Sequence, residues 1–184
     1  MQERVSAEEA VERLRSTLGD DVGDVEVRFG HLDATCSAEN LRHVMTTLRD
    51  EPGLRFEFFT FLSAIDRSEF GGPDKPDKHG GLELIVHLYS PAHVLHINVR
   101  VPLDLADPRC ESISAIYRGA NWHEREMRDM FGIQFEGHPN LTGIYLPEDF
   151  EGHPGLRSFK LPNRAFIKPW PGAKDPEEAA AGGR

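Results

Sequence analysis

Six prolines between residues 137 and 171 constrain the fold of this chain more than any other feature of the sequence. They stand at positions 139, 147, 154, 162, 169 and 171. Proline has a fixed φ and donates no backbone hydrogen bond, so this segment can form neither a regular helix nor a central strand. A disordered linker would lack large apolar side chains, but here there are eleven: Leu141, Ile144, Tyr145, Leu146, Phe150, Leu156, Phe159, Leu161, Phe166, Ile167 and Trp170. We therefore predict an extended strap, residues 137–171, that needs a surface on which to bury these side chains.

The charge of the strap is opposite to that of the rest of the chain. The whole sequence has a net charge of −10, whereas residues 152–170 contain Arg157, Lys160, Arg164 and Lys168 and no acidic residue. A basic, aromatic, extended segment is typical of protein-binding elements. The alternative is that the strap wraps the acidic body of its own chain. Before it, residues 1–136 are expected to form one domain, and after it residues 172–184 are expected to be a disordered tail.

Composition excludes several classes of function. The acidic balance argues against nucleic acid and against direct docking on anionic lipid. No apolar stretch approaches the roughly 18 residues of a membrane span, so no direct membrane insertion is expected, and the charged start, MQERVSAEEA, resembles neither a signal peptide nor a transit peptide. Cys36 and Cys110 are far apart and form no CxxC motif. Two cysteines indicate a reducing, cytoplasmic setting and are too few to ligate an iron–sulfur cluster.

Apolar spacing and cap signals divide the first 132 residues into helices and strands. Helices are expected from Ser6 to Gly19, with a Ser6–Glu9 capping box, over Leu41–Leu48 after a Ser37 cap, from Asp107 to Arg118, and from Asn121 to Gly132. Strands are expected at Val25–Phe29, Phe56–Ile65, Leu82–Tyr89 and Val94–Val101, the last two as a hairpin. The composition of residues 70–81 predicts a mobile loop.

The tetrapeptide EGHP occurs twice, at Glu136–Pro139 and Glu151–Pro154. Two histidines and two carboxylates can bind zinc, but structural zinc ligands usually stand closer together in sequence. We favour two turns, in which each glycine adopts an unusual dihedral angle and each histidine donates a hydrogen bond to a carbonyl. A second histidine group, His87 and His96 across the hairpin with His93 near its turn, is interpreted as exposed hairpin histidines rather than a metal site.

The helix at 121–132 is the densest polar feature. Its spacing predicts the ion pairs Glu124–Arg128 and Arg125–Asp129. Glu126 shares a face with apolar residues, so it is either paired or has a raised pKa, as a general acid would. No positioned nucleophile or cofactor motif accompanies it, and an ion-paired face that positions the strap or a partner is the better interpretation. A small metal-dependent hydrolase using Glu124, Glu126, His138 and His153 stays as the alternative.

The stretch GANWHEREMRDMFGIQFEGHPNL, followed by EGHPGLRSFKLP, resembles the C subunit of the proton-pumping NADH:quinone oxidoreductase, the 30 kDa subunit family of respiratory complex I. The shared pattern comprises Glu124-Arg125-Glu126, Asp129, Met130-Phe131 and His138, then Gly152-His153-Pro154 and Arg157. The resemblance covers roughly residues 55–171. The family pattern also carries a basic residue soon after the first Gly-His-Pro; Asn140–Gly143 has none here, so one partner contact would be absent or supplied elsewhere.

The resemblance implies an α+β fold with a mainly antiparallel sheet and packed helices. It implies a subunit of the hydrophilic arm that packs against the D and B subunits near the quinone site, peripheral on the cytoplasmic face of the cell membrane. It implies no catalytic residue, metal or cofactor of its own, since NADH, FMN, iron–sulfur clusters and quinone belong to other subunits of this translocase. Membrane-bound hydrogenases and ferredoxin- or F420-linked complexes carry related subunits and remain alternatives. The residues expected to form the partner-binding or structural motif are Glu124, Arg125, Glu126, Asp129, Phe131, Gly132, His138, Pro139, His153, Pro154, Arg157 and Trp170.

Overall fold

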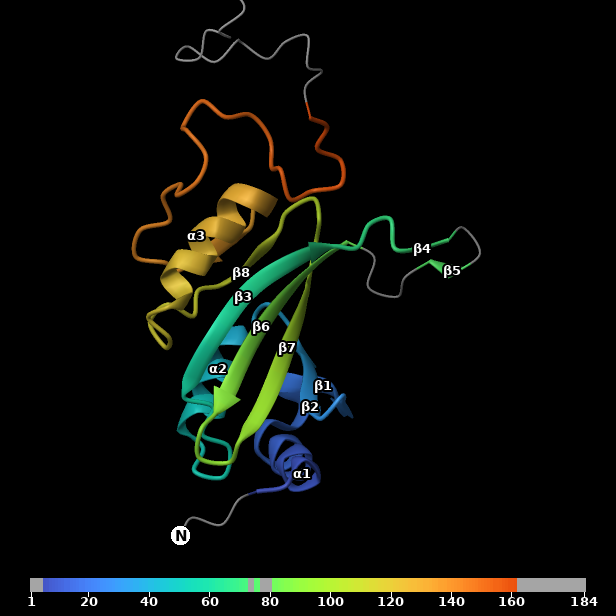
Figure 1. Ribbon diagram of the computed structural model, residues 1–184, viewed down its shortest axis with the longest axis vertical. Coiled ribbons are helices and arrows are strands. Elements are labelled where there is room, and N and C mark those ends of the chain that lie inside the picture. The colour runs from blue at the N-terminus through green and yellow to red at the C-terminus, as the bar shows by residue number, and fades with distance from the viewer. Residues whose placement is uncertain (1–4, 73–74, 77–80, 162–184) are drawn as a thin grey trace, which may run out of the picture.

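A five-stranded sheet forms the centre of the protein, with its helices packed around it (Figure 1). The computed structural model describes residues 5–72, 75–76 and 81–161. The helices are α1 (Ala7–Leu18), α2 (Leu41–Asp50) and α3 (Ala120–Phe131), with a 3₁₀ turn at Gly19–Asp21. The strands of the main sheet are β1 (Val22–Arg28), β2 (His31–Cys36), β3 (Phe58–Asp66), β6 (Leu82–Ser90) and β7 (Leu95–Leu103).

The strand order in this sheet is β1-β2-β7-β6-β3. The β2–β7 pair is parallel and the other neighbouring pairs are antiparallel. The predicted hairpin is confirmed, because β6 and β7 pair in one register from Leu82↔Leu103 to Ser90↔Leu95. The expected α+β fold with a mainly antiparallel sheet is therefore present.

Helices α1 and α2 lie on the same side of the sheet (Figure 1). The Ser6 side chain accepts a hydrogen bond from the Glu9 backbone, and the Glu9 side chain accepts one from the Ser6 backbone, which is the predicted capping box. Gly19 ends the helix, as expected. Two donors that the helix itself cannot satisfy thus find partners, which fixes where α1 begins.

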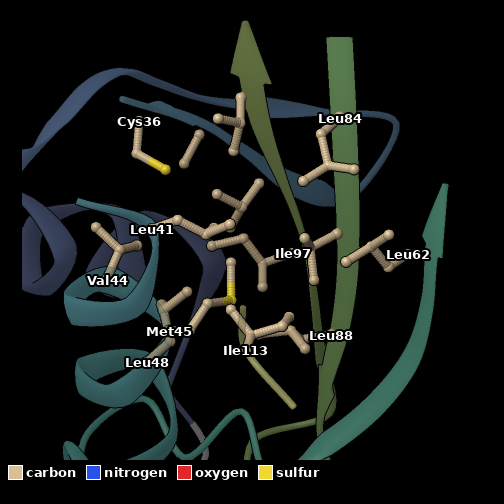
Figure 2. Close-up of a cluster of buried hydrophobic side chains, with 14 of the residues drawn as sticks. Cys36, Leu41, Val44, Met45, Leu48, Leu62, Leu84, Leu88, Ile97 and Ile113 are labelled. Atoms are coloured by element: carbon tan, nitrogen blue, oxygen red, sulfur yellow. The ribbon is translucent and has the colours of Figure 1, made fainter. Parts of the chain in front are cut away.

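The core is formed where α2 faces the sheet. The predicted apolar stripe of α2 is fully buried: Leu41, Val44, Met45 and Leu48. Figure 2 shows Leu41 and Met45 extending from α2 toward Leu84, Leu88 and Ile97 of the central hairpin. Burying one such side chain stabilises the fold by roughly 1.5–3 kcal/mol. This stripe accounts for the docking of α2.

The opposite face of the sheet carries a cluster of charged side chains. Alternation along the strands turns Asp33, Glu83 and Arg100 away from the core, and the Arg100 guanidinium lies between the two carboxylates, 3.0 Å from Glu83 Oε1. The strand β2, which carries Asp33, was not predicted from the sequence. Its residues His31–Cys36 alternate between polar and apolar side chains, which is the pattern of a half-buried strand, so the signal was present in the sequence.

The predicted helix from Asp107 to Arg118 is wrong. Residues Arg109–Glu111 instead form a short strand, β8, which pairs in parallel with β9 (Gln134–Glu136). The Asp107 carboxylate accepts a hydrogen bond from the Arg109 side chain, 2.7 Å away, rather than capping a helix. A cap signal is local, and here tertiary pairing with the segment after α3 outweighs it.

The remaining predictions concern segments that the structure describes only in part or not at all. In the predicted loop 70–81, Gly71–Gly72 (β4) pairs with Lys75–Pro76 (β5). Residues 162–184 lie outside the described part of the chain, so the end of the strap with Trp170, and the predicted tail, stay predictions. Among the described helices, none is both long and apolar enough to cross a bilayer.

Candidate partner-binding site

The predicted motif residues gather around α3. This helix lies beside β3, and the first part of the strap, drawn in orange, runs around it (Figure 1). The helix ends at Gly132, whose φ of 77° is left-handed and whose N–H donates to the Arg128 carbonyl, so the predicted glycine stop is confirmed. The predicted Asn121 cap is wrong, because the cap position is Gly119 and no side chain caps it.

Glu124 is the buried carboxylate of this helix. Its side chain is fully buried, and its two oxygens accept hydrogen bonds from the Ser112 hydroxyl (2.6 Å) and the Ile113 N–H (2.7 Å). Burial raises its pKa to about 7, against the opposing effect of those hydrogen bonds. The sequence pointed to Glu126 as the unusual carboxylate, but Glu126 is half-buried. The correct position is two residues earlier, on the face of α3 that meets the Ser112 turn.

His138, from the first EGHP copy, lies against the start of α3. Its Nε2 is 3.3 Å from the Asn121 carbonyl oxygen and 3.8 Å from Glu124 Oε2, and its Nδ1 accepts a hydrogen bond from the Asn140 N–H. The neutral tautomer with its proton on Nε2 satisfies both nitrogens. Burial lowers the pKa of His138, and the charge of Arg125 lowers it further. The predicted histidine–carbonyl hydrogen bond is therefore present at this copy.

His153, from the second EGHP copy, lies against the other end of α3. Its Nδ1 is 2.9 Å from the Asp129 carbonyl oxygen, and the Gly155 N–H donates to the Met130 carbonyl, 2.7 Å away. The last carbonyls of a helix have no partner within it, so the strap completes the hydrogen bonding of the α3 C-terminus. Gly137 and Gly152 have φ values of 80° and 89°, which confirms the expected glycine turns.

Asp129 holds the middle of the strap. Its Oδ2 accepts hydrogen bonds from three consecutive N–H groups, those of Ile144 (2.8 Å), Tyr145 (2.9 Å) and Leu146 (3.3 Å). Burial alone would raise the pKa of Asp129, but these hydrogen bonds and the Arg128 guanidinium lower it. One carboxylate thus fixes a turn of the strap on the surface of the helix.

Arg125 also contacts the strap, through the Thr142 and Gly143 carbonyls at 3.0 and 3.1 Å. Within the described residues, the predicted ion pair between Arg125 and Asp129 is absent, because Arg125 bonds the strap carbonyls. The predicted pair between Glu124 and Arg128 is also absent, because Glu124 bonds the turn at Ser112 and Ile113. The helix face is therefore not a row of ion pairs. Its charged side chains form hydrogen bonds with backbone groups of neighbouring segments.

Arg157 anchors the strap to the end of β3. Its backbone N–H donates to Asp66 Oδ2 at 2.9 Å, its Nε donates to the Asp66 carbonyl at 3.1 Å, and its guanidinium lies over the Phe70 ring. These anchors show that residues 137–157 follow the body of their own chain, as the wrapping alternative held. The contacts are mostly made by polar and backbone groups.

The large apolar side chains of this region remain partly or largely exposed. Tyr145 is 61% exposed, Trp122 on α3 is 60% exposed and Leu161 is 85% exposed. Phe150 is also exposed and stacks on Phe159. A hollow of about 430 Å³ lies between the α3 C-terminus and the strap, lined on the strap side by Leu146 and Phe150 among others. The strap is fixed mainly by polar and backbone contacts; its Leu141 and Leu156 side chains pack against the core, while Tyr145, Phe150 and Leu161 are exposed.

The other predicted positions are supporting ones. Phe131 packs against the core and closely contacts Gly155, and Pro139 lines a hollow with Trp122. Pro154 is half-buried beside His153, and Trp170 lies outside the described residues. Sequence reasoning missed Ser112 and Asp66, whose partners are 12 and 91 positions away. The sequence feature that could have indicated them is a polar residue at the end of an apolar strand or in a turn.

The sequence and the fold are similar to those of known proteins. Residues 34–165 match the family described as the respiratory-chain NADH dehydrogenase 30 Kd subunit, so the similarity begins upstream of the expected residue 55. The C subunit of NADH-quinone oxidoreductase from Roseiflexus sp. strain RS-1 is 39% identical over 140 residues, which cover 76% of this chain and 75% of that protein. The C subunit from Saccharopolyspora erythraea is 36% identical over 137 residues, covering 74% of this chain and 52% of that protein. The C subunit from Rhizobium rhizogenes is 35% identical over 131 residues, covering 71% and 61%. The chain thus spans between half and two thirds of the length of the last two relatives.

Two solved structures are similar. The trypsin-resistant fragment of Nqo5 has a TM-score of 0.59 at 26% identity, covering 73% of this chain and 98% of that one. The membrane-bound sulfane sulfur reductase, an archaeal respiratory membrane complex, contains a chain with a TM-score of 0.65 at 24% identity, covering 84% and 85%, which shows the fold alone. Because the family match covers more than half of the sequence, this chain belongs to the family of the 30 Kd subunit of the respiratory-chain NADH dehydrogenase, the C subunit of NADH-quinone oxidoreductase.

Proposed function

We propose that this chain is a structural and assembly subunit of a proton-translocating NADH:quinone oxidoreductase, in its hydrophilic arm on the cytoplasmic face of the membrane. The complex transfers electrons from NADH to quinone and couples this to proton transport. The chain itself binds none of the redox cofactors of the complex, supplies no catalytic residue, and packs against the D subunit near the quinone site, with the B subunit nearby. The family membership and the names of the relatives support the assignment to this class of complex.

The observation that carries the partner-binding role is the outward orientation of the strap. Asp129, His153 and Arg157 fix its backbone to the body, while Tyr145 and Phe150 stay exposed. Leu141 and Leu156 pack against the core, but a strap that served only to cover its own domain would also bury Tyr145 and Phe150. An exposed group of large apolar side chains on a fixed scaffold is typical of a protein-binding surface.

The geometry argues against the metal-dependent hydrolase. His138 bonds the Asn121 carbonyl and His153 bonds the Asp129 carbonyl. These two helix positions are eight residues apart, or about 12 Å along the axis. Two ligands of one zinc ion lie about 2.0–2.1 Å from it, so the two histidines, each held at its own end of α3, do not converge on one ion.

The role is tested by substituting the exposed strap residues in a cell that assembles the complex. We expect Tyr145→Glu and Phe150→Glu to leave the isolated chain folded, because both side chains are exposed. Complex that is affinity-purified through a tag on the D subunit should be depleted of these two variants. Phe29→Glu is the matched control, since Phe29 is an exposed aromatic residue in the β1–β2 turn, away from the strap.

Crosslinks from a photoreactive residue at position 145 identify the neighbour directly, and we expect the D subunit. Normal recovery of both strap variants with the tagged D subunit would refute the docking role of the strap. If position 145 crosslinks to other subunits of the complex but not to the D subunit, the D subunit is rejected as the partner.

A further inference from the structure

Three histidines meet on the face of the sheet that points away from the core. They are His31 at the start of β2, His87 in β6 and His96 in β7. Each offers one ring nitrogen, and these three nitrogens all lie within 4.8 Å of one another. No other group of three or more potential metal ligands occurs in the described part of the chain.

The strand register brings these residues together. In the β6–β7 hairpin, Tyr89 pairs with His96 and His87 pairs with Asn98, so both histidines face away from the core residues Leu88 and Ile97. The parallel neighbour β2 pairs Leu32 with Ile97, which places the preceding His31 beside His96. The ring centroids of His31 and His96 are 4.7 Å apart, and those of His87 and His96 are 5.2 Å apart.

Two of these rings have nitrogen atoms without a partner. The Nδ1 atoms of His87 and His96 are buried and make no hydrogen bond within the protein. His87 as a whole is only 8% exposed, and the Phe61 ring stacks on it at 5.2 Å between centroids. Buried polar atoms are nearly always satisfied, so an unpartnered ring nitrogen in a protein interior requires an explanation.

Two of the imidazoles are favoured in the neutral form, which binds metal. Burial lowers the pKa of both His87 and His96, the His31 ring lowers both further, and the His96 ring also lowers that of His87. Neutral imidazole has a free electron pair, and three such nitrogens are a common ligand set for divalent transition metals. No carboxylate belongs to the set, which disfavours calcium and magnesium, because these ions take oxygen ligands.

We propose that His31, His87 and His96 form a binding site for a divalent transition-metal ion of the zinc class. Ligands of a tetrahedral zinc ion, at about 2.0–2.1 Å from it, are about 3.4 Å apart. The three nitrogens lie within 4.8 Å of one another and the rings stack, so metal binding would require the half-buried rings of His31 and His96 to turn until the nitrogens reach this separation. The bound ion would connect β2 to the β6–β7 hairpin and keep a fourth position for water or a further ligand.

The site is tested on the full chain with ZnCl₂ by isothermal titration calorimetry and with CoCl₂ by absorption spectroscopy. We expect one equivalent of Zn²⁺ to bind and the thermal midpoint to rise with Zn²⁺ concentration, since the ion binds only the folded state. We expect Co²⁺ to give the intense visible bands of four-coordination, which zinc then removes. Mutating a residue that only supports a metal ligand typically lowers metal affinity roughly 10–100-fold. Because His31 and His96 would be ligands themselves, His31→Ala and His96→Ala should each lower Zn²⁺ affinity by more than that.

The matched control is His43→Ala, which removes an exposed histidine of α2 next to Asp21 and should leave Zn²⁺ binding unchanged. If circular dichroism shows that a single variant does not fold, the histidine ring resonances of the wild-type protein are followed by NMR instead. Zn²⁺ must then shift the resonances of three histidines, and His43, identified by the resonance lost in His43→Ala, must not be one of them. Absence of saturable one-to-one binding, or undiminished binding in the folded His31→Ala/His96→Ala double variant, would overturn the proposal.

Discussion

Replacing Asp129 by asparagine should release the middle of the strap while leaving the domain folded. The carboxylate accepts N–H groups from Ile144, Tyr145 and Leu146, two of them within 2.9 Å. A hydrogen bond to a charged group contributes about 1.5–3 kcal/mol and a neutral one about 0.5–1.5 kcal/mol. Asparagine keeps an acceptor oxygen but loses the charge, so about 1 kcal/mol is lost at each of the two short bonds, or about 2 kcal/mol in total.

Hydrogen exchange followed by mass spectrometry measures this loss where it occurs. A loss of about 2 kcal/mol corresponds to a roughly 30-fold increase in the local opening equilibrium. We therefore expect peptides that contain residues 144–146 to exchange about 30-fold faster in Asp129→Asn. Peptides from β6 should be unchanged, because the strap packs outside the core. Asp149→Asn, at an exposed strap position, is the matched control.

The pH dependence gives the same prediction a second test. The folded pKa of Asp129 is lowered, so its stabilising effect is present above the unfolded value of about 3.9 and is lost as pH falls through the folded pKa. Protection of residues 144–146 in the wild type should therefore persist from neutral pH down to about pH 4 and disappear below it. Unchanged exchange in Asp129→Asn, or equal acceleration in Asp149→Asn, would refute the reasoning.

Three further substitutions test the contacts of α3. The pKa of Glu124 is raised to about 7 in the folded state, so the wild type loses stability as pH rises from the unfolded pKa toward 7. In urea denaturation, the difference in unfolding free energy between the wild type and Glu124→Gln should therefore change by up to about 3 kcal/mol over that pH range. A difference that stays constant with pH would contradict this prediction. His153→Ala removes the hydrogen bond to the Asp129 carbonyl and should cost about 1 kcal/mol in the same assay, whereas no cost would mean that water replaces it. Gly132→Ala places a Cβ 2.8 Å from His153 Nε2 at a left-handed residue, so we expect a loss of about 1–2 kcal/mol or more, and an unchanged thermal midpoint would contradict that strain.

The sequence predicted those elements whose signals are local and agree with their packing. The Ser6–Glu9 capping box, the α2 stripe and the β6–β7 hairpin all lie where the sequence placed them. In each case, residues close in sequence also share a face, so the periodic pattern and the burial coincide. The mistaken helix at residues 107–118 shows the opposite case, since its cap signal competes with pairing to a segment more than 20 residues away.

The candidate site could be predicted only in part for the same reason. The two EGHP turns were predictable, because a glycine with positive φ and a histidine that bonds a carbonyl are properties of the tetrapeptide. The partners of the charged residues were not. Helical spacing suggests that Arg125 meets Asp129, but each finds a backbone group of the strap within 3.0 Å. Sequence spacing describes only neighbours on the same helix, and here the strap lies closer.

The two EGHP copies have the same sequence and act at opposite ends of one helix. His138 accepts the Asn140 N–H and bonds the first turn of α3, whereas His153 and Gly155 bond its last carbonyls. The last carbonyls of a helix have no partner within it, so the C-terminus of α3 is a point where a crossing chain can attach by its backbone and polar groups, whereas His138 makes an additional bond to a carbonyl of the first turn. Because polar anchors and the partly buried side chains of Leu141 and Leu156 hold the strap, Tyr145 and Phe150 need not be buried to fix it. One segment can therefore follow its own domain and keep exposed aromatic side chains for the partner docking proposed above.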